Sequence, residues 1–177
     1  MKTRPAFEWI LPAAVALTAG PAYCTVYLTT EQAQQAIYPG QGLVASLVRL
    51  DDAQAKTIEK RSRVNVRQRD LHAWRTPEGG WFFVDEVLGK HEFITYAVGL
   101  TAAGAVKQVE IMEYRESFGQ DVRNEAWRHQ FVGKTVADPL QLERDIKNIS
   151  GATLSSRHVT DGVKRLLVTW DVVLRGK

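Results

Sequence analysis

Cysteine is almost absent from this chain, which has one, Cys24, among 177 residues. A single cysteine cannot form an internal disulfide, and no Cys-x-x-Cys-His sequence is present to attach a haem. The fold must therefore be stabilised by its hydrophobic core alone. If the protein is redox-active, its electrons must be carried by something other than paired thiols or an attached haem.

Long apolar runs are also missing, because no stretch reaches the roughly 20 residues that a membrane-spanning helix needs. A shorter apolar stretch, residues 10–19, follows Lys2 and Arg4 and precedes Gly20-Pro21-Ala22. This order is typical of an export signal. We expect residues 1–22 to be a signal peptide, cleaved or retained. The protein would then be periplasmic or lie on the outer face of the inner membrane.

The chain has no strong excess of one charge, with 23 basic and 20 acidic residues and a formal net charge of +3. Its basic residues are scattered among acids, apart from a locally basic run at residues 56–69 that only one aromatic residue, Trp74, follows closely. We interpret that run as a solvated helix end and loop. Nucleic acid is therefore not an expected partner.

Sequence patterns for metal-dependent or hydrolytic chemistry are lacking as well. The four histidines are not spaced as ligand pairs, and no carboxylate-histidine helix motif occurs. We therefore expect no bound metal. A Gly-x-Ser-x-Gly elbow for a nucleophilic serine is also absent, so nothing supports hydrolysis.

The composition, 45% hydrophobic and 24% charged, is that of one globular domain. Alternating apolar residues and turn residues predict strands at residues 43–50, 71–75, 81–88, 92–100 and 105–114. Helices are predicted from residue 29 to Pro39, over 51–60, over 124–132, and from Ser155 or Ser156 to the C-terminus, with a short helix or turn over 138–149. The expected fold class is α+β, an antiparallel or mixed sheet of about five strands packed against helices, with a long amphipathic C-terminal helix.

The segment 150–156 leads directly into that last helix. The first turn of a helix has free backbone N–H groups and a partial positive charge, which favour a phosphate. Gly151 and Ala152 leave room for an anion, and Thr153, Ser155 and Ser156 offer hydroxyl groups. The alternative is that these hydroxyl residues are ordinary helix caps, which are far commoner than phosphate sites.

Three motifs in order resemble the FMN-binding domain family, which includes the flavin subunits of the sodium-pumping quinone reductase and the Rnf complex. Residues 150–155 resemble its Ser-Gly-Ala-Thr-x-Ser signature. Upstream, residues 109–119 resemble a strand followed by an acidic turn and a glycine, and residues 127–134 resemble an element with a Gln-Phe-x-Gly-Lys sequence. The resemblance covers about residues 85–170. We accordingly expect residues 81–177 to be the FMN-binding domain and 23–80 the N-terminal part of the exported domain.

The resemblance implies FMN as the cofactor, held by its phosphate at or covalently on Thr153, the residue that carries a phosphoester bond in the family. Members with covalent flavin usually have an aspartate six residues earlier, where this chain has Lys147, and Ser117 stands where threonine is commoner. Both covalent attachment and phosphate binding without a bond therefore remain open. The expected cofactor-binding residues are Thr153, Ser150, Gly151, Ala152, Leu154, Ser155, Glu116, Ser117 and Gly119.

The function that this family resemblance implies is electron transfer through FMN rather than stand-alone catalysis. The expected partners are a membrane redox subunit and, if the bond forms, a flavin transferase. Two alternatives stay open: an FMN-dependent sensory or regulatory subunit of a membrane redox system, and an interaction module without flavin. Yellow colour would distinguish the last from the others. Rapid reduction by a membrane fraction would distinguish the carrier from the sensor.

Overall fold

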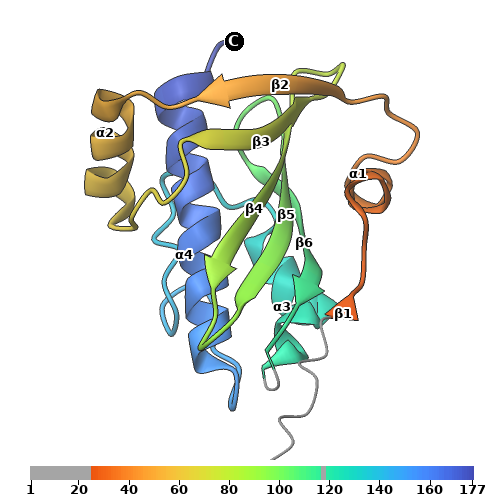
Figure 1. Ribbon diagram of the computed structural model, residues 1–177, viewed down its shortest axis with the longest axis vertical. Helices are drawn as coiled ribbons and strands as arrows, with labels where there is room; N and C mark the ends of the chain where they lie inside the picture. Colours follow the sequence, from red (N-terminus) through yellow and green to blue (C-terminus); the bar gives the residue numbers. More distant parts are fainter. Residues whose placement is uncertain (1–24, 117–118) are drawn as a thin grey trace, which may run out of the picture.

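A computed structural model describes residues 25–116 and 119–177 of the chain (Figure 1). The predicted signal peptide, residues 1–22, and the predicted site residue Ser117 lie outside the described residues. The structure confirms the α+β class, the antiparallel sheet and the long C-terminal helix. The strands are β1 (Thr25–Val26), β2 (Val44–Arg49), β3 (Asp70–Arg75), β4 (Trp81–Leu88), β5 (Phe93–Leu100) and β6 (Val106–Tyr114).

All strand pairs in the described part of the chain are antiparallel, and the sheet has the order β1-β6-β5-β4-β3-β2. Short turns join β3 to β4, β4 to β5 and β5 to β6. The strands of each of these pairs are neighbours in the sheet, so β3 to β6 form a meander. Tight turns explain this order, since a two- to five-residue loop can only join adjacent antiparallel strands. The short β1 adds to the outer edge of β6, where Thr25 is opposite Tyr114.

Helices cover both faces of the sheet. They are α1 (Thr30–Ile37), α2 (Asp52–Ser62), α3 (Glu125–Arg128) and α4 (Thr153–Thr169). Two 3₁₀ turns, Gln120–Arg123 and His129–Phe131, flank α3, and a π-helical turn, Trp170–Leu174, follows α4. Figure 1 shows α4 lying along one face of the sheet, with α2 beside it, and α1 against the opposite face.

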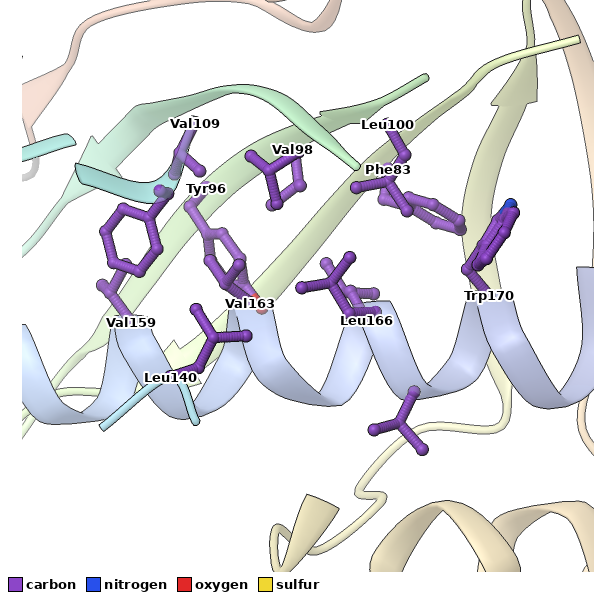
Figure 2. Packing of buried hydrophobic residues seen from close by; sticks show 14 of the residues in the cluster. Phe83, Tyr96, Val98, Leu100, Val109, Leu140, Val159, Val163, Leu166 and Trp170 are labelled. Carbon is purple, nitrogen blue, oxygen red and sulfur yellow. The ribbon is translucent and has the colours of Figure 1, made fainter. Parts of the chain in front are cut away.

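The main core lies between α4 and the sheet (Figure 2). Val159, Val163 and Leu166 of α4 recur at helical spacing and face Tyr96 and Val98 of β5. Val159 and Val163 are fully buried. Burying each such side chain contributes about 1.5–3 kcal/mol to folding. This packing fixes where α4 begins, at the end of the sheet that carries the β4–β5 turn (Figure 1).

A polar contact joins α4 to the sheet within this apolar layer. The Arg165 guanidinium donates to the Asp85 carboxylate on β4, and the Tyr96 hydroxyl donates to the same carboxylate at 2.7 Å. Burial, together with the Asp85 charge, raises the pKa of Tyr96 well above its ordinary value, so the hydroxyl keeps its proton and remains a donor. The three side chains together fix the register of α4 on β4 and β5.

Two predicted segments between β6 and α4 are less regular than a single α-helix. The segment 124–132 is helical as predicted, with α3 followed directly by a 3₁₀ turn, and Gly133 then has a left-handed backbone (φ 80°). The segment 138–149, for which a short helix or turn was predicted, forms turns and an isolated bridge between Leu142 and Ile146. Its local carboxylate explains this, because Asp145 accepts the amides of Leu140 and Gln141 that a helix would have used.

Candidate functional site

The start of α4 differs from that of the other long helices. Both α1 and α2 begin with a capping box, in which Thr29 or Asp51 accepts an amide of the first turn. The N-cap residue of α4 is Ala152, which makes no side-chain hydrogen bond. The first three amides of α4 have no acceptor four residues earlier within the helix. They are therefore available to an external acceptor.

The expected serine caps are not caps, which corrects the sequence prediction. The helix begins at Thr153, so Ser155 and Ser156 lie inside its first turn, where both are buried. Ser156 Oγ donates to the Ala152 carbonyl at 2.9 Å, and Ser155 Oγ lies 2.9 Å from the Tyr114 hydroxyl. Their hydroxyl groups thus fasten the helix start to itself and to β6.

Gly119 allows the close approach of β6 to α4. Its backbone is left-handed (φ 95°), and a Cβ there would lie 2.6 Å from the Tyr114 hydroxyl and 2.9 Å from Ser155 Oγ. Burial raises the pKa of Tyr114, and the Ser155 hydrogen bond partly offsets this. Gly119 thus allows β6 and α4 to pack closely beside the cavity described below, and it does not itself line that cavity.

Thr153, the first residue of α4, is exposed, and its Oγ1 accepts a hydrogen bond from Asn148 Nδ2 at 3.0 Å. The segment before the helix is held by the motif around Trp127. Trp127 Nε1 donates to the Lys147 carbonyl at 2.7 Å, and the Lys147 amide donates to Gln130 Oε1 at 2.8 Å. The motif therefore fixes the approach of the chain to Thr153.

Asp145 does not take the place of the aspartate missing at position 147. Its carboxylate accepts hydrogen bonds from the amides of Leu140 and Gln141. It also forms an ion pair with Lys134, whose Nζ lies 3.1 Å from Asp145 Oδ2. Burial raises the pKa of Asp145, but the Gln141 amide, the Lys134 ammonium and the Leu140 amide together lower it by more. The pKa of Asp145 therefore lies below its ordinary value. The Asp145 carboxylate therefore already has its partners away from Thr153. Asn148, which the sequence did not single out, is the polar side chain that contacts Thr153.

A cavity of about 550 Å³ opens at the start of α4. This volume is within the range of small-molecule sites. Its lining residues are Lys90, His91, Glu116, Gly151, Ala152, Thr153, Leu154 and Ser155. The structure thus brings the predicted Glu116 together with residues 151–155, while Ser150 and Gly119 do not line the cavity.

Glu116 connects the end of β6 to the β4–β5 turn. Its Oε1 accepts the amides of His91 at 2.5 Å and Glu92 at 3.0 Å. Burial raises the pKa of Glu116, but the amides of Glu92, His91 and Lys90 lower it by more, so its pKa lies below the ordinary value. Glu116 is therefore ionised at neutral pH.

Lys90 and His91 were missed by sequence reasoning, because they belong to no motif and lie in a turn. The hairpin pattern holds a signal that could have found them. In an antiparallel order β4-β5-β6, the β4–β5 turn and the C-terminal end of β6 lie at the same end of the sheet. Any ligand beside Glu116 would therefore also lie beside this turn.

The described aromatic residues near the motifs belong to the core. Tyr114, Trp127 and Phe131 are buried, and the rings of Trp127 and Phe131 meet edge to face at 5.2 Å. Within residues 25–116 and 119–177, no group of three or more histidine, cysteine or acidic side chains is arranged to hold a metal ion. Over the same ranges, none of the helices has the length and apolar character needed to cross a bilayer.

Comparison with known families identifies part of this chain. Residues 89–168 match the model of the FMN-binding domain, whereas no curated protein matches the chain. The matched segment runs from the β4–β5 turn to the last turn of α4, and it contains every residue that lines the cavity. Residues 89–168 therefore form a member of the FMN-binding domain family, and FMN is the cofactor that this membership indicates.

Proposed function

We propose that this protein is an exported electron carrier that holds FMN by its phosphate at the start of α4. The observation that carries the proposal is the uncapped first turn of α4, which opens into a cavity within the matched segment. FMN supplies the one- or two-electron chemistry, while the chain supplies its position and its electrostatic surroundings.

The residues present fit the phosphate end of FMN. Free amides and the positive end of the helix dipole favour a dianion at Thr153 to Ser155. Gly151 has a left-handed backbone (φ 83°) and open space around its Cα, so no side chain blocks the approach. Lys90 adds a cation to the cavity. A cap such as Asp51 of α2 would fill this place with a protein carboxylate, and α4 has none.

The exposed Thr153 hydroxyl supports covalent attachment as the finer form of the proposal. In that step a bond forms between Thr153 Oγ1 and the FMN phosphorus of FAD. The pyrophosphate bond of FAD breaks, AMP leaves, and the threonine proton is released. The partner is a flavin transferase, with a metal ion on that enzyme. Asn148, which already donates to Thr153 Oγ1, would orient the oxygen.

Export by residues 1–22 and a membrane redox subunit as partner complete the proposal. A protein outside the cytoplasm that holds a flavin needs an electron donor and acceptor in the membrane or beside it. A sensory subunit would bind the same flavin but would need no rapid donor. Nothing in the geometry of the described residues favours the sensory role, so the carrier is the function that we put forward.

Replacement of Thr153 tests the proposal. The full chain, produced with the flavin transferase, should carry an FMN phosphoryl group that survives denaturation, and a membrane fraction with a reductant should reduce it rapidly. Thr153→Val should lose the acid-stable flavin completely, because it removes the oxygen and keeps the shape. Mass spectrometry of the peptide that contains Thr153 is the measurement.

Thr57→Val is the matched control, because it makes the same change at an exposed threonine on α2, away from the cavity. It should keep the full flavin content. Acid-stable flavin that persists in Thr153→Val would refute attachment at this residue. A flavin that is bound but reduced only slowly would favour the sensory role over the carrier.

A further inference from the structure

We infer that the β4–β5 turn is the second wall of the FMN site, and that Glu116 is a positioning residue that holds this turn in place. Lys90 and His91 of the turn line the same cavity as the start of α4. The inference rests on the proposed function, since it takes FMN to occupy that cavity. Lys90 and His91 would then contact the flavin ring, because the phosphate lies at the start of α4.

Three contacts define how the turn is held. The Gly89 amide donates to the Glu92 carbonyl at 2.7 Å and closes the turn. Glu116 Oε1 then accepts the amides of His91 and Glu92. A Cβ at Gly89 would lie 2.6 Å from Glu116 Oε1 and 3.1 Å from the Glu92 carbonyl oxygen, so the Glu116 side chain would have to shift to admit it. The turn therefore packs directly on the Glu116 carboxylate.

The charges of the cavity favour a reduced flavin. Reduction adds negative charge to the flavin ring, and a nearby cation stabilises that form. Lys90 supplies a full positive charge, and His91 supplies a ring N–H donor. Glu116 is the one carboxylate among the cavity residues, and its Oε1 faces the turn amides. The carboxylate thus acts mainly through the turn.

The two roles that Glu116 could have predict opposite signs. If its charge acted directly on the flavin, its removal would stabilise the reduced form and raise the midpoint potential. If it positions the turn, its removal releases Lys90 and His91 from the cavity and lowers the potential. The direction of the change therefore separates positioning from direct contact.

The experiment measures the midpoint potential and the FMN affinity of the full chain loaded with FMN. Lys90→Met should weaken the binding of reduced FMN relative to oxidised FMN by about tenfold. For a two-electron couple this is a fall in potential of about 30 mV. Glu116→Ala should also lower the potential, and the double variant should fall by less than the sum, because both changes act through Lys90.

Matched controls remove the same charges elsewhere. Lys56→Met on α2 and Glu78→Ala in the β3–β4 turn change exposed residues away from the cavity, and both should leave the potential unchanged. A Lys90→Met protein with the potential of Lys56→Met, or a Glu116→Ala protein with a raised potential, would overturn the inference. A wild-type chain that binds no FMN would instead overturn the proposed function, and it would do so before any variant is compared.

Discussion

Individual side chains in this protein divide into those that build the site and those that fasten it. Ser155 and Tyr114 illustrate the second group, since their hydroxyl groups meet at 2.9 Å behind the cavity. Sequence reasoning placed Ser155 as a cap, because a serine before an apolar helical run usually is one. Its true partner is 41 residues earlier in the chain, and no local pattern encodes that contact.

The buried contact of Arg165 with Asp85 yields a prediction on stability. Asp85→Asn should lower the free energy of unfolding by about 3 kcal/mol, because it leaves the guanidinium in the core without its counter-charge. Tyr96→Phe should cost only about 1 kcal/mol, since it removes one hydrogen bond and keeps the ion pair. Urea denaturation monitored by circular dichroism measures both.

The exposed ion pair between Arg49 and Asp70 provides the control for this prediction. Its side chains are 76% and 70% exposed, against 10% and 19% for Arg165 and Asp85. Asp70→Asn should therefore change the free energy of unfolding by less than about 0.5 kcal/mol. Equal effects of the Asp70 and Asp85 replacements would show that burial does not govern this pair.

Among the elements, the strands could be predicted more accurately than the helix ends. The strand expected at 81–88 is found at Trp81–Leu88. The other four predicted strands begin and end within one residue of their predicted bounds, because alternation and turn residues are both local signals. The start of α4 could not be predicted, since it depends on packing against β6. The segment 138–149 lacks a helix because a side chain, Asp145, takes its amides.

The close packing of α4 on the sheet leads to a prediction at Gly162. In an open helix, replacing glycine by alanine stabilises by about 1 kcal/mol. Here a Cβ would lie 2.3 Å from the Tyr96 hydroxyl and 2.9 Å from Val87 Cγ1. Gly162→Ala should therefore destabilise the protein, by roughly 2 kcal/mol. Thermal unfolding measures the change, and a rise in melting temperature would contradict the packing described.

The chain as a whole gathers its site at one end of the sheet. The β4–β5 turn, the end of β6 and the start of α4 meet there, and Thr25 of β1 pairs with Tyr114 beside them (Figure 1). The family motifs predicted Glu116 and residues 151–155 but not the β4–β5 turn, because the turn contains no motif residue and reaches the site only through the order of the strands.

The proposed site has the phosphate of FMN on the first turn of α4, and Leu154 allows a direct test of this placement. Its side chain lines the cavity, is 42% exposed and follows the first helical residue. An acidic residue in this turn suits the helix dipole, so Leu154→Asp should not destabilise the fold relative to Leu154→Asn. Its charge would nevertheless repel a phosphate.

The measurement is the dissociation constant of FMN for the full-length Leu154→Asp and Leu154→Asn proteins, obtained by titration of flavin fluorescence. We predict that the aspartate weakens binding by about tenfold or more relative to asparagine, with an unchanged melting temperature. Equal affinities of the two variants would mean that the phosphate does not lie at the start of α4.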